Sequence, residues 1–216
     1  MNNQELQQQY TDSKGILIVV SGPAGAGKGT ICKCLVEGSC KTALSVSETT
    51  RPMRKGDAEG VTYHFVSKTD FENRISENYY LEWARVYDNY YGTPKSRIME
   101  KLNAGHDVIL EIDPQGADNI RKNFPQAITV FIMPPSLEEL RRRITGRGSE
   151  TPEQIDKRMS CTEDEIGQAP KYDYILVNRD QKLEQTVEQL KAVITAEHLR
   201  TSRILNTTPA ERTESV

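Results

Sequence analysis

A short apolar run that leads straight into a glycine-rich turn constrains this chain more than any other feature of its sequence. Residues 16–20 read ILIVV, residues 21–30 read SGPAGAGKGT, and a helical pattern begins at about Lys28. Glycines let a backbone wrap so that successive N–H groups point at phosphate oxygens, while a helix N-terminus and a lysine add positive charge. We therefore predict a phosphate-binding loop between a strand and a helix, in preference to a plain turn with an exposed lysine.

The residue after Lys28 departs from the usual form of such loops. Gly29 stands where a Ser or Thr normally offers a hydroxyl to Mg²⁺, and Thr30 comes one place late. Mg²⁺ keeps several waters and binds nucleotide phosphates readily. We expect the ion to be carried mainly by the nucleotide, or by carboxylates elsewhere, and we assign no protein residue as a metal ligand.

Short apolar runs rich in β-branched residues recur along the chain and alternate with helical stretches. Because near-continuous apolar runs are typical of strands buried on both faces, they predict a parallel sheet flanked by helices, an α/β fold. The runs after the first lie at about 43–46, 108–112, 127–132 and 172–177.

Two inserts and two polar ends interrupt this alternation. The first insert, about 47–92, is rich in Arg, Tyr and Glu, and the second, about 146–160, is rich in Gly and Arg. Residues 1–14 and 206–216 are polar and unpatterned, which predicts tails. We expect one domain over 15–205 with two hinged appendages, the second a mobile flap over the phosphate site.

The amino-acid composition limits the classes of partner that we expect this protein to bind. The 216 residues include 28 Lys and Arg against 31 Asp and Glu, and 36% are hydrophobic. This is enough apolar material for a sizeable core, and a net charge of -3 gives no general attraction to nucleic acid or to a membrane. The four cysteines lack zinc-site spacing, and no apolar run is long enough to span a membrane. We expect a cytoplasmic protein whose anionic ligands are held by local basic clusters, and the oligomeric state is left open.

The first insert opens with closely spaced arginines. In TTRPMRKGDAEGVTY, residues 49–63, Arg51 and Arg54 can fork onto the oxygens of one phosphate monoester, with the Tyr63 hydroxyl as a third donor. A solvated, charged loop would have the same composition. From the residues alone both interpretations stay open.

Further along the same insert, Glu82 precedes an aromatic cluster. A carboxylate is acceptor-only, which suits a ligand edge with two adjacent donors such as the N1–H and 2-amino groups of guanine, and Tyr91 can offer its hydroxyl to a phosphate. The alternative is that Trp83, Tyr90 and Tyr91 pack a small core while Glu82 faces water. Spacing alone favours that alternative.

Two further carboxylates end the run at 108–112. Glu111 and Asp113 fall on one side of the predicted strand, at the end where open α/β sheets bind ligands. We interpret them as contacts to a metal-bound water or to substrate rather than as a simple helix cap. Thr93 with Pro94, by contrast, has the pattern of a helix N-terminus.

Three arginines lie in and around the second insert. Arg143 and Arg147 are four residues apart and approach a glycine, and Arg158 follows on the next helical stretch. On a glycine-bounded flap such side chains can close onto transferring phosphoryl oxygens and then withdraw. This pattern predicts charge stabilisation only when both substrates are bound.

Taken together, these motifs resemble the guanylate kinase family over about residues 15–200. Several motifs in order at consistent spacing make the resemblance far more specific than the loop alone. It implies a P-loop NTPase-type core sheet, an inserted GMP-binding subdomain and a lid, and transfer of the γ-phosphoryl group of ATP to GMP or dGMP. The segments that carry it are SGPAGAGK, SVSETTRPMRKGDAEGVTYHFV, LEWARVYDNYYGTPK, ILEIDPQG, FIMPPSLEELRRRITGRGSET and ILVN.

The resemblance also implies roles position by position. ATP would be held by Gly22, Pro23, Ala24, Gly25, Ala26, Gly27, Lys28, Gly29 and Thr30, with Asn178 near the adenine. The GMP phosphate would be bound by Arg51, Arg54, Tyr63 and Tyr91, and the guanine by Ser47, Glu82, Thr93 and Asp113. The catalytic set would be Lys28, Arg51, Arg143, Arg147 and Arg158.

Two other functions stay under consideration. Guanylate-kinase-like domains also serve as peptide-binding modules without catalysis, and a related kinase can use a different phosphate acceptor. Lys28 and the arginines argue against the first, and Glu82 together with Ser47 favours guanine. Because phosphoryl transfer leaves little covalent chemistry to side chains, we expect positioning and charge stabilisation without a general base.

Overall fold

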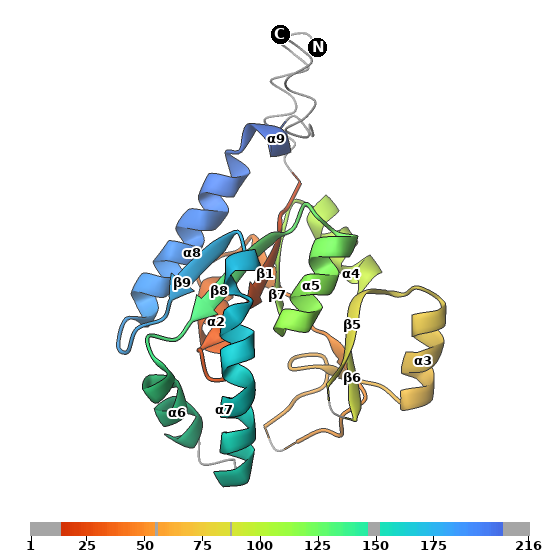
Figure 1. Cartoon of the computed structure of the whole chain (residues 1–216). Coiled ribbons are helices and arrows are strands. Elements are labelled where there is room, and N and C mark those ends of the chain that lie inside the picture. The colour runs from red at the N-terminus through yellow and green to blue at the C-terminus, as the bar shows by residue number, and fades with distance from the viewer. Residues whose placement is uncertain (1–13, 55, 87, 147–151, 205–216) are drawn as a thin grey trace.

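The computed structural model describes residues 14–54, 56–86, 88–146 and 152–204. At its centre is a parallel sheet in the order β2 (Thr42–Leu44), β7 (Asp107–Glu111), β1 (Leu17–Ser21), β8 (Ile128–Met133) and β9 (Tyr174–Val177) (Figure 1). Each strand coincides with one of the predicted apolar runs to within two residues or so. The prediction of an α/β fold with a parallel sheet is therefore confirmed.

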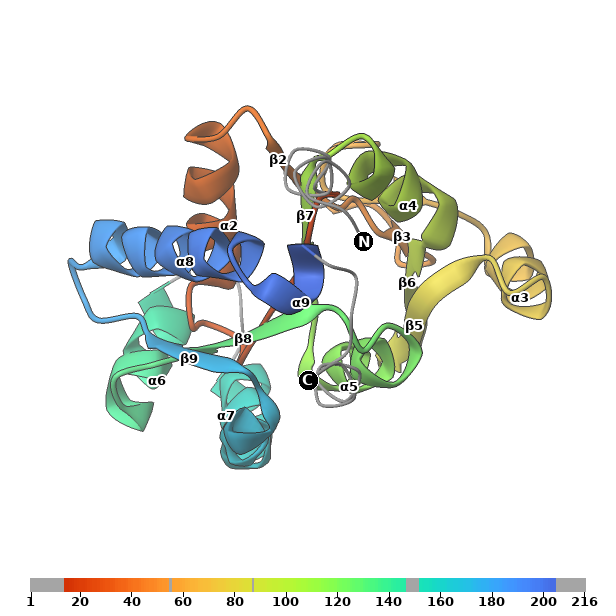
Figure 2. The same cartoon turned by 90° about the horizontal axis from the view of Figure 1, so that it is seen from above.

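Helices cover both faces of this sheet (Figure 2). One face carries α2 (Lys28–Glu37) and α8 (Leu183–His198), and the other carries α4 (Lys95–Asn103) and α5 (Pro114–Asn123). Alternate residues of β1 serve the two sides, since Ile18 packs with α2 and α8 and Leu17 with α4 and α5. Because neither face of the strand meets water, its sequence is apolar throughout.

A second, mixed sheet is formed by the first insert and the two residues that follow it. Its order is β4 (His64–Phe65), β3 (Glu48–Thr49), β6 (Asn89–Pro94) and β5 (Tyr80–Val86). Helix α3 (Lys68–Ser76) is capped by the Ser67 hydroxyl, which accepts the amide of Asp70 at 3.0 Å. Phe71 of α3 stacks on Tyr80 with ring centroids 4.3 Å apart, so this sheet has an aromatic core of its own.

The prediction that Thr93 caps a helix is wrong. Thr93 belongs to β6, and α4 begins at Lys95 with Pro94 as its N-cap residue and no side-chain cap. The Thr93 hydroxyl instead donates to Oε1 of Glu82 at 2.7 Å. A hydrogen bond to a carboxylate is stronger than one to a neutral group, so the side chain turns into the sheet.

Two helices flank the gap at 147–151 in the described residues. They are α6 (Leu137–Gly146) and α7 (Pro152–Gly167), which pack together through Leu140, Ile144 and Ile155. Much of the predicted flap at 146–160 is therefore helical, and its Arg147 lies outside the described residues. A 3-10 turn at Ala169–Lys171 leads from α7 into β9.

The N-terminal edge of the parallel sheet is anchored by the last helices. Asp107, which opens β7, accepts the backbone N–H of Ile16 at 2.9 Å and lies 2.9 Å from Nε2 of His198. Beside it the buried Glu197 accepts the Tyr174 hydroxyl at 2.6 Å and Nε of Arg203, in α9 (Thr201–Ile204), at 3.0 Å. The beginning and the end of the domain thus meet at the base of the sheet. Within the described ranges, no helix combines the length and apolar character needed to cross a bilayer.

Candidate active site

The glycine-rich loop joins β1 to α2 at the carboxyl edge of the parallel sheet. Gly22 and Gly27 have φ angles of 137° and 95°, which L side chains rarely adopt. A Cβ at Gly22 would lie 2.4 Å from the carbonyl oxygen of Ile132, and one at Gly27 would lie 2.4 Å from Nδ2 of Asn178. Both positions therefore require glycine, for conformation and for space.

Lys28 begins α2 and folds back over the loop. Its Nζ donates to the carbonyl oxygens of Gly22 at 2.5 Å and Pro23 at 3.1 Å. Burial lowers the pKa of the Lys28 ammonium, and the carboxylates of three acids oppose that shift: Glu111, Glu165 and Asp113. The cation thus stands at the loop with acidic side chains around it.

Asn178 supports the loop from behind. Its side chain is buried, and Nδ2 donates to the carbonyl oxygen of Ala26 at 2.8 Å. The Thr186 hydroxyl reaches its Oδ1 at 3.4 Å. The amide that we predicted near the adenine is thus engaged in holding the loop, and the adenine contact stays a prediction.

The position of the missing hydroxyl faces a carboxylate. A Cβ at Gly29 would lie 3.3 Å from Oε2 and 3.4 Å from Oε1 of Glu111, at the end of β7. Carboxylate oxygens and water are the ligands that Mg²⁺ prefers. A single carboxylate lies beside this part of the loop, so Glu111 fits a contact to a nucleotide-bound magnesium ion or to its waters, and that contact stays a prediction.

The three residues predicted to contact guanine from the second sheet form one hydrogen-bonded chain. Thr93 donates to Glu82, as described above, and the Ser47 hydroxyl lies 3.3 Å from that of Thr93. Trp83 and Tyr90 do make an aromatic contact on this sheet, yet Glu82 is only 5% exposed. The alternative in which Glu82 faces water is therefore wrong.

Burial raises the pKa of Glu82 to about 7; the Thr93 hydroxyl opposes this, and the negative charge of Asp113 adds to it. Asp113 is the N-cap of α5, where its Oδ1 accepts the amide of Gly116 at 2.8 Å. We predicted a ligand contact at Asp113 rather than a helix cap, and the structure shows that Asp113 does cap the helix. One carboxyl oxygen serves the helix, and the ligand contact stays a prediction.

The predicted phosphate-binding residues gather around a buried arginine. Arg51 lies over the Tyr63 ring, 5.5 Å from its centroid, and the rings of Tyr63 and Tyr91 are 5.7 Å apart. Its guanidinium pairs with Oδ2 of Asp57 at 2.9 Å, and that oxygen also accepts the backbone N–H of Arg54 at 2.7 Å. Those contacts hold the pKa of Asp57 below its ordinary value, the Arg54 amide contributing most. The Arg54 side chain itself is exposed.

Arg143 and Arg158, predicted to act together with the flap, contact different parts of the structure. Nε of Arg143 donates to Glu139 at 2.7 Å, and its NH2 donates to the carbonyl oxygen of Asn178 at 3.0 Å. Arg143 is therefore beside the residue that supports the loop. Arg158 lies on α7, and its charge reaches Glu165 of the same helix. With Arg147 outside the described residues, closure of all three on one phosphoryl group stays a prediction.

Two acidic residues at the site, Asp57 and Glu165, were not predicted from the sequence. Asp57 stands three residues after Arg54, so the spacing of the arginine motif contained a usable signal. Glu165 comes from α7, accepts the backbone N–H of Ala24 in the loop and places negative charge near Lys28. No local pattern links it to a loop so far away along the chain.

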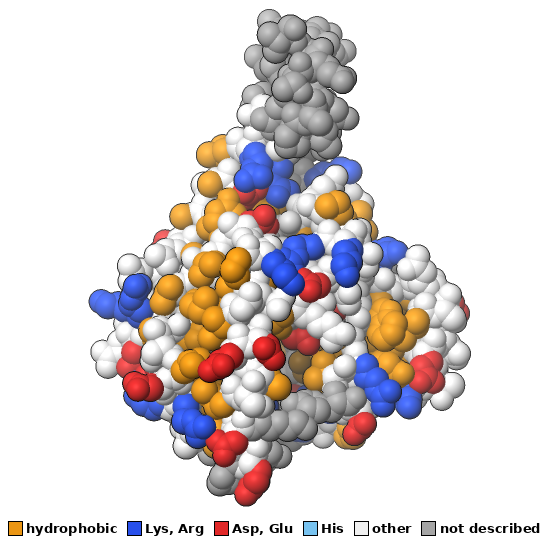
Figure 3. All heavy atoms as spheres, viewed as in Figure 1, with side chains coloured by type: hydrophobic (Ala, Val, Ile, Leu, Met, Phe, Trp, Pro, Cys, Tyr) orange, Lys and Arg blue, Asp and Glu red, His pale blue; other side chains and the backbone are white. Residues whose placement is uncertain are grey.

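Groups from the two sheets share one cleft. The charge of Glu111 acts on the Tyr63 hydroxyl, and the charge of Asp113 acts on Glu82, although each pair joins the parallel sheet to the second sheet. The space-filling view shows the surface hollowed between α7 and the second sheet (Figure 3). The loop and the proposed acceptor residues thus line opposite sides of a common space.

A parallel sheet with this loop at its carboxyl edge, faced by a second sheet across a cleft, defines a nucleotide-binding protein of the P-loop kinase class. The family model described as guanylate kinase matches residues 14–197. The chain therefore belongs to the guanylate kinase family, and it is a phosphotransferase.

Individual relatives agree with this assignment. The chain is 48% identical to a guanylate kinase of Caldanaerobacter subterraneus subsp. tengcongensis over 190 residues, covering 88% of this chain and 91% of the relative. It is 49% identical to a guanylate kinase of Clostridioides difficile over 193 residues, covering 89% and 93%. The crystal structure of guanylate kinase from Anaplasma phagocytophilum matches with a TM-score of 0.73 and 33% identity, over 88% of this chain and 90% of that one.

Proposed function

We propose that this protein transfers the γ-phosphoryl group of ATP to GMP, and more weakly to dGMP, and that the residues of the cleft bind and align the two nucleotides. The observation that carries the proposal is the buried carboxylate of Glu82, linked through Thr93 to Ser47. In the part of the chain that the structure describes, no cation pairs with Glu82. An unpaired buried carboxylate is costly, so it favours a ligand that brings donors. Guanine brings two adjacent donors, whereas adenine has an acceptor at its N1.

The acceptor phosphate is assigned to the cluster around Arg51. The guanidinium is already oriented by Asp57 and by the Tyr63 ring, which lowers the entropy lost when a phosphate binds. Tyr91 is adjacent through its ring contact with Tyr63. Arg54, exposed at the same turn, supplies the second guanidinium of the predicted fork.

The donor phosphates are assigned to the loop from Gly22 to Thr30. Its backbone N–H groups and the start of α2 attract anions, and Lys28 adds a full charge. Mg²⁺, bound with ATP, neutralises phosphate charge, and Glu111 is the residue placed to contact the ion or its waters. Arg143, Arg147 and Arg158 are assigned to the charge that develops in the transition state.

Catalysis then follows from alignment and charge. The two binding regions hold the GMP phosphate oxygen facing the γ-phosphorus of ATP, which removes the entropy cost of a bimolecular encounter. Cations around the transferring group stabilise its equatorial oxygens, and no side chain needs to act as a general base. All four cysteines are free thiols, which suits the reducing cytoplasm where we place the reaction.

An acceptor panel tests this proposal. The purified protein is incubated with ATP and Mg²⁺ and, in separate reactions, GMP, dGMP, AMP, CMP or UMP, and the ADP formed is measured. GMP should be the fastest acceptor and dGMP the next. Equal turnover of AMP and GMP would assign the protein to the kinases with a different acceptor.

Calorimetry separates the enzyme from a peptide-binding module. An enzyme of this type binds GMP without any partner protein, because the acceptor site is complete within the chain. Heat of binding should be measurable with GMP at millimolar concentration or below. Its absence at millimolar GMP would support the non-catalytic alternative.

A further inference from the structure

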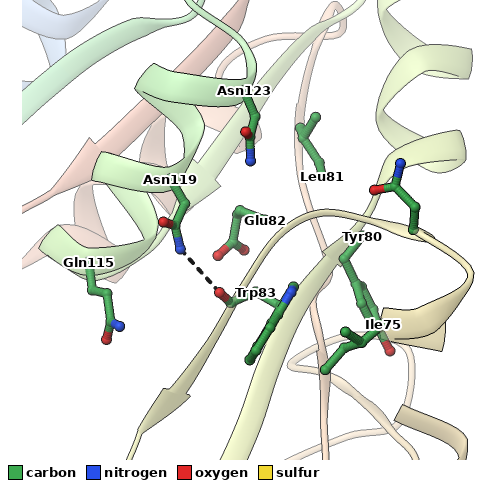
Figure 4. A pocket seen from close by; sticks show the side chains of 9 residues that line it. Ile75, Tyr80, Leu81, Glu82, Trp83, Gln115, Asn119 and Asn123 are labelled. Carbon is green, nitrogen blue, oxygen red and sulfur yellow. Dashed lines mark hydrogen bonds between the residues drawn. The ribbon is translucent and has the colours of Figure 1, made fainter. Parts of the chain in front are cut away.

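Helix α5 begins directly against the carboxylate of Glu82. Figure 4 shows Glu82 on β5 pointing toward α5, the helix that carries Gln115 and Asn119. The third residue of that helix, Gly116, is buried, and its amide donates to Asp113 at 2.8 Å. A Cβ at Gly116 would lie 3.1 Å from Oε2 of Glu82 and 3.3 Å from Oδ1 of Asp113. A side chain at position 116 would therefore crowd both carboxylates.

The backbone gives no reason for a glycine at this position. Gly116 is absent from the glycines with left-handed φ angles and lies within a regular helix. In a helix interior glycine is less favourable than alanine, because it loses more backbone entropy on folding. Its presence is explained instead by the close approach of α5 to the second sheet.

The atoms around Gly116 cannot move away from an added methyl group without disturbing contacts of their own. Glu82 is buried, and its other carboxyl oxygen is held by Thr93 at 2.7 Å. Oδ1 of Asp113 is held by the helix amide, and the third close atom, 3.3 Å away, is the Cβ of Ile112. A methyl group would therefore shift the two carboxylates, the helix start or both by a few tenths of an ångström.

We propose that Gly116 is a specificity-determining positioning residue, which lets α5 hold the Glu82 and Asp113 carboxylates at the spacing that guanine requires. The inference rests on the proposed function, because it takes those two carboxylates as the guanine contacts. Adenine has no pair of donors for Glu82, so a displaced carboxylate weakens the use of GMP far more than the use of AMP. Gly116 itself touches no reacting atom.

The test is the Gly116→Ala variant, with steady-state kinetics for GMP and for AMP at saturating ATP and Mg²⁺. We expect KM for GMP to rise on the order of tenfold, with a smaller change in kcat, because small misplacements of binding groups are costly. The kinetics with AMP should stay unchanged, and the melting temperature, measured in parallel, shows whether the variant is folded. Gly167→Ala is the matched control, since an added Cβ there, at the end of α7, meets no atom within 4 Å.

A double-mutant cycle shows whether Gly116 acts through Glu82. In a Glu82→Gln background, adding Gly116→Ala should raise KM for GMP clearly less than in the unmodified protein, because one of the two carboxylates that the methyl displaces is already gone. A full tenfold rise in that background would overturn the proposal. So would an unchanged KM for GMP in the folded single variant, or an equal loss with GMP and AMP.

Further variants separate a failure of the role of Gly116 from a failure of the proposed function. If Gly116→Ala fails to fold, the Gly116→Ala, Glu82→Ala double variant should fold, because the second change removes the carboxylate that the methyl meets; an unfolded double variant also refutes the proposal. If the unmodified protein shows no preference for GMP, the proposed function fails. If the unmodified protein prefers GMP and Glu82→Gln loses that preference while Gly116→Ala keeps it, only the role of Gly116 fails.

Discussion

The phosphate-binding loop and the second sheet, the two regions that we propose to hold nucleotides, are built in different ways. The loop is a contiguous stretch whose glycines are demanded by φ angles and by close backbone contacts, such as Gly22 against Ile132. The second sheet collects side chains from distant positions, and each is held by another side chain, as Arg51 is by Asp57 and Glu82 is by Thr93. Under the proposed function, the loop binds what all nucleoside triphosphates share, and the second sheet is the region that distinguishes one acceptor from another.

The largest expected effect comes from a substitution in the phosphate-binding loop. Lys28→Ala should lower kcat by about 10² or more with every acceptor, because it removes a charge aimed at the transferring phosphoryl group. Steady-state kinetics with GMP and with the best secondary acceptor measure this, and Lys33→Ala, an exposed lysine of the same helix, is the control. Near-normal kcat in Lys28→Ala would remove the loop from the donor site.

The next effect tests the second sheet. Glu82→Gln keeps the shape of the side chain but places an NH₂ group against a guanine donor, a mismatch worth about 1–3 kcal/mol. The GMP and AMP values of kcat/KM should converge, while kcat with AMP stays the same. Glu59→Gln, at an exposed position of the same insert, should behave as the unmodified protein. If GMP preference survived in Glu82→Gln, guanine would be recognised elsewhere.

The raised pKa of Glu82 predicts a pH dependence of about tenfold. With a pKa of about 7 the carboxylate is mostly protonated at pH 6 and mostly ionised at pH 8, so KM for GMP should fall between these values. The GMP phosphate also titrates near pH 6, so the difference between the profiles of the unmodified protein and Glu82→Gln is the quantity to measure. Identical profiles would mean that Glu82 does not titrate in this range.

The same pKa has the opposite sign for stability. The folded group binds its proton more tightly than the unfolded one, whose pKa is 4.5, so its contribution to stability is complete below about pH 4.5. That contribution is lost as the pH rises through about 7. Folding and GMP binding thus place opposite demands on this carboxylate, a conflict that the loop does not contain.

The smallest expected effect concerns Gly29, which stands where the usual loop has a Ser or Thr. Gly29→Ser should tighten the apparent affinity for Mg²⁺ by roughly twofold, because a hydroxyl can replace one of the waters of the ion. Gly29→Ala is the matched control, since it adds the same Cβ near Glu111 without an oxygen. A magnesium titration of initial rates at fixed free ATP distinguishes the two. Equal behaviour of the Ser and Ala variants would contradict the account of this position.

The same contrast explains how much could be predicted from the sequence. The five parallel strands were predictable because each leaves a short apolar run, most plainly β1, β7 and β8, which are buried on both faces. The loop was predictable because its four glycines fall within one short stretch. The chain from Ser47 through Thr93 to Glu82 was not, because hydrogen bonds across strands leave no local pattern. Thr93 was therefore mistaken for a helix cap.

The roles of side chains that act through other residues also could not be predicted from local sequence patterns. Asn178 supports the loop through Ala26 from the far end of the chain, and Glu165 reaches the loop from α7. The glycine at 116 is informative only once its distance to Glu82 is known. In each case the residue type was visible, but its purpose depends on a neighbour that only the tertiary structure supplies.

The anchor at the base of the parallel sheet has a consequence for how the chain is made. Asp107 joins the amide of Ile16, at the start of the domain, to His198, near the end of α8. The anchor is therefore complete only after α8 has been synthesised, although β1 can pair with β7 and β8 before then. The ends of the domain also lie side by side there, so the chain can be joined end to end and reopened elsewhere without disturbing the cleft.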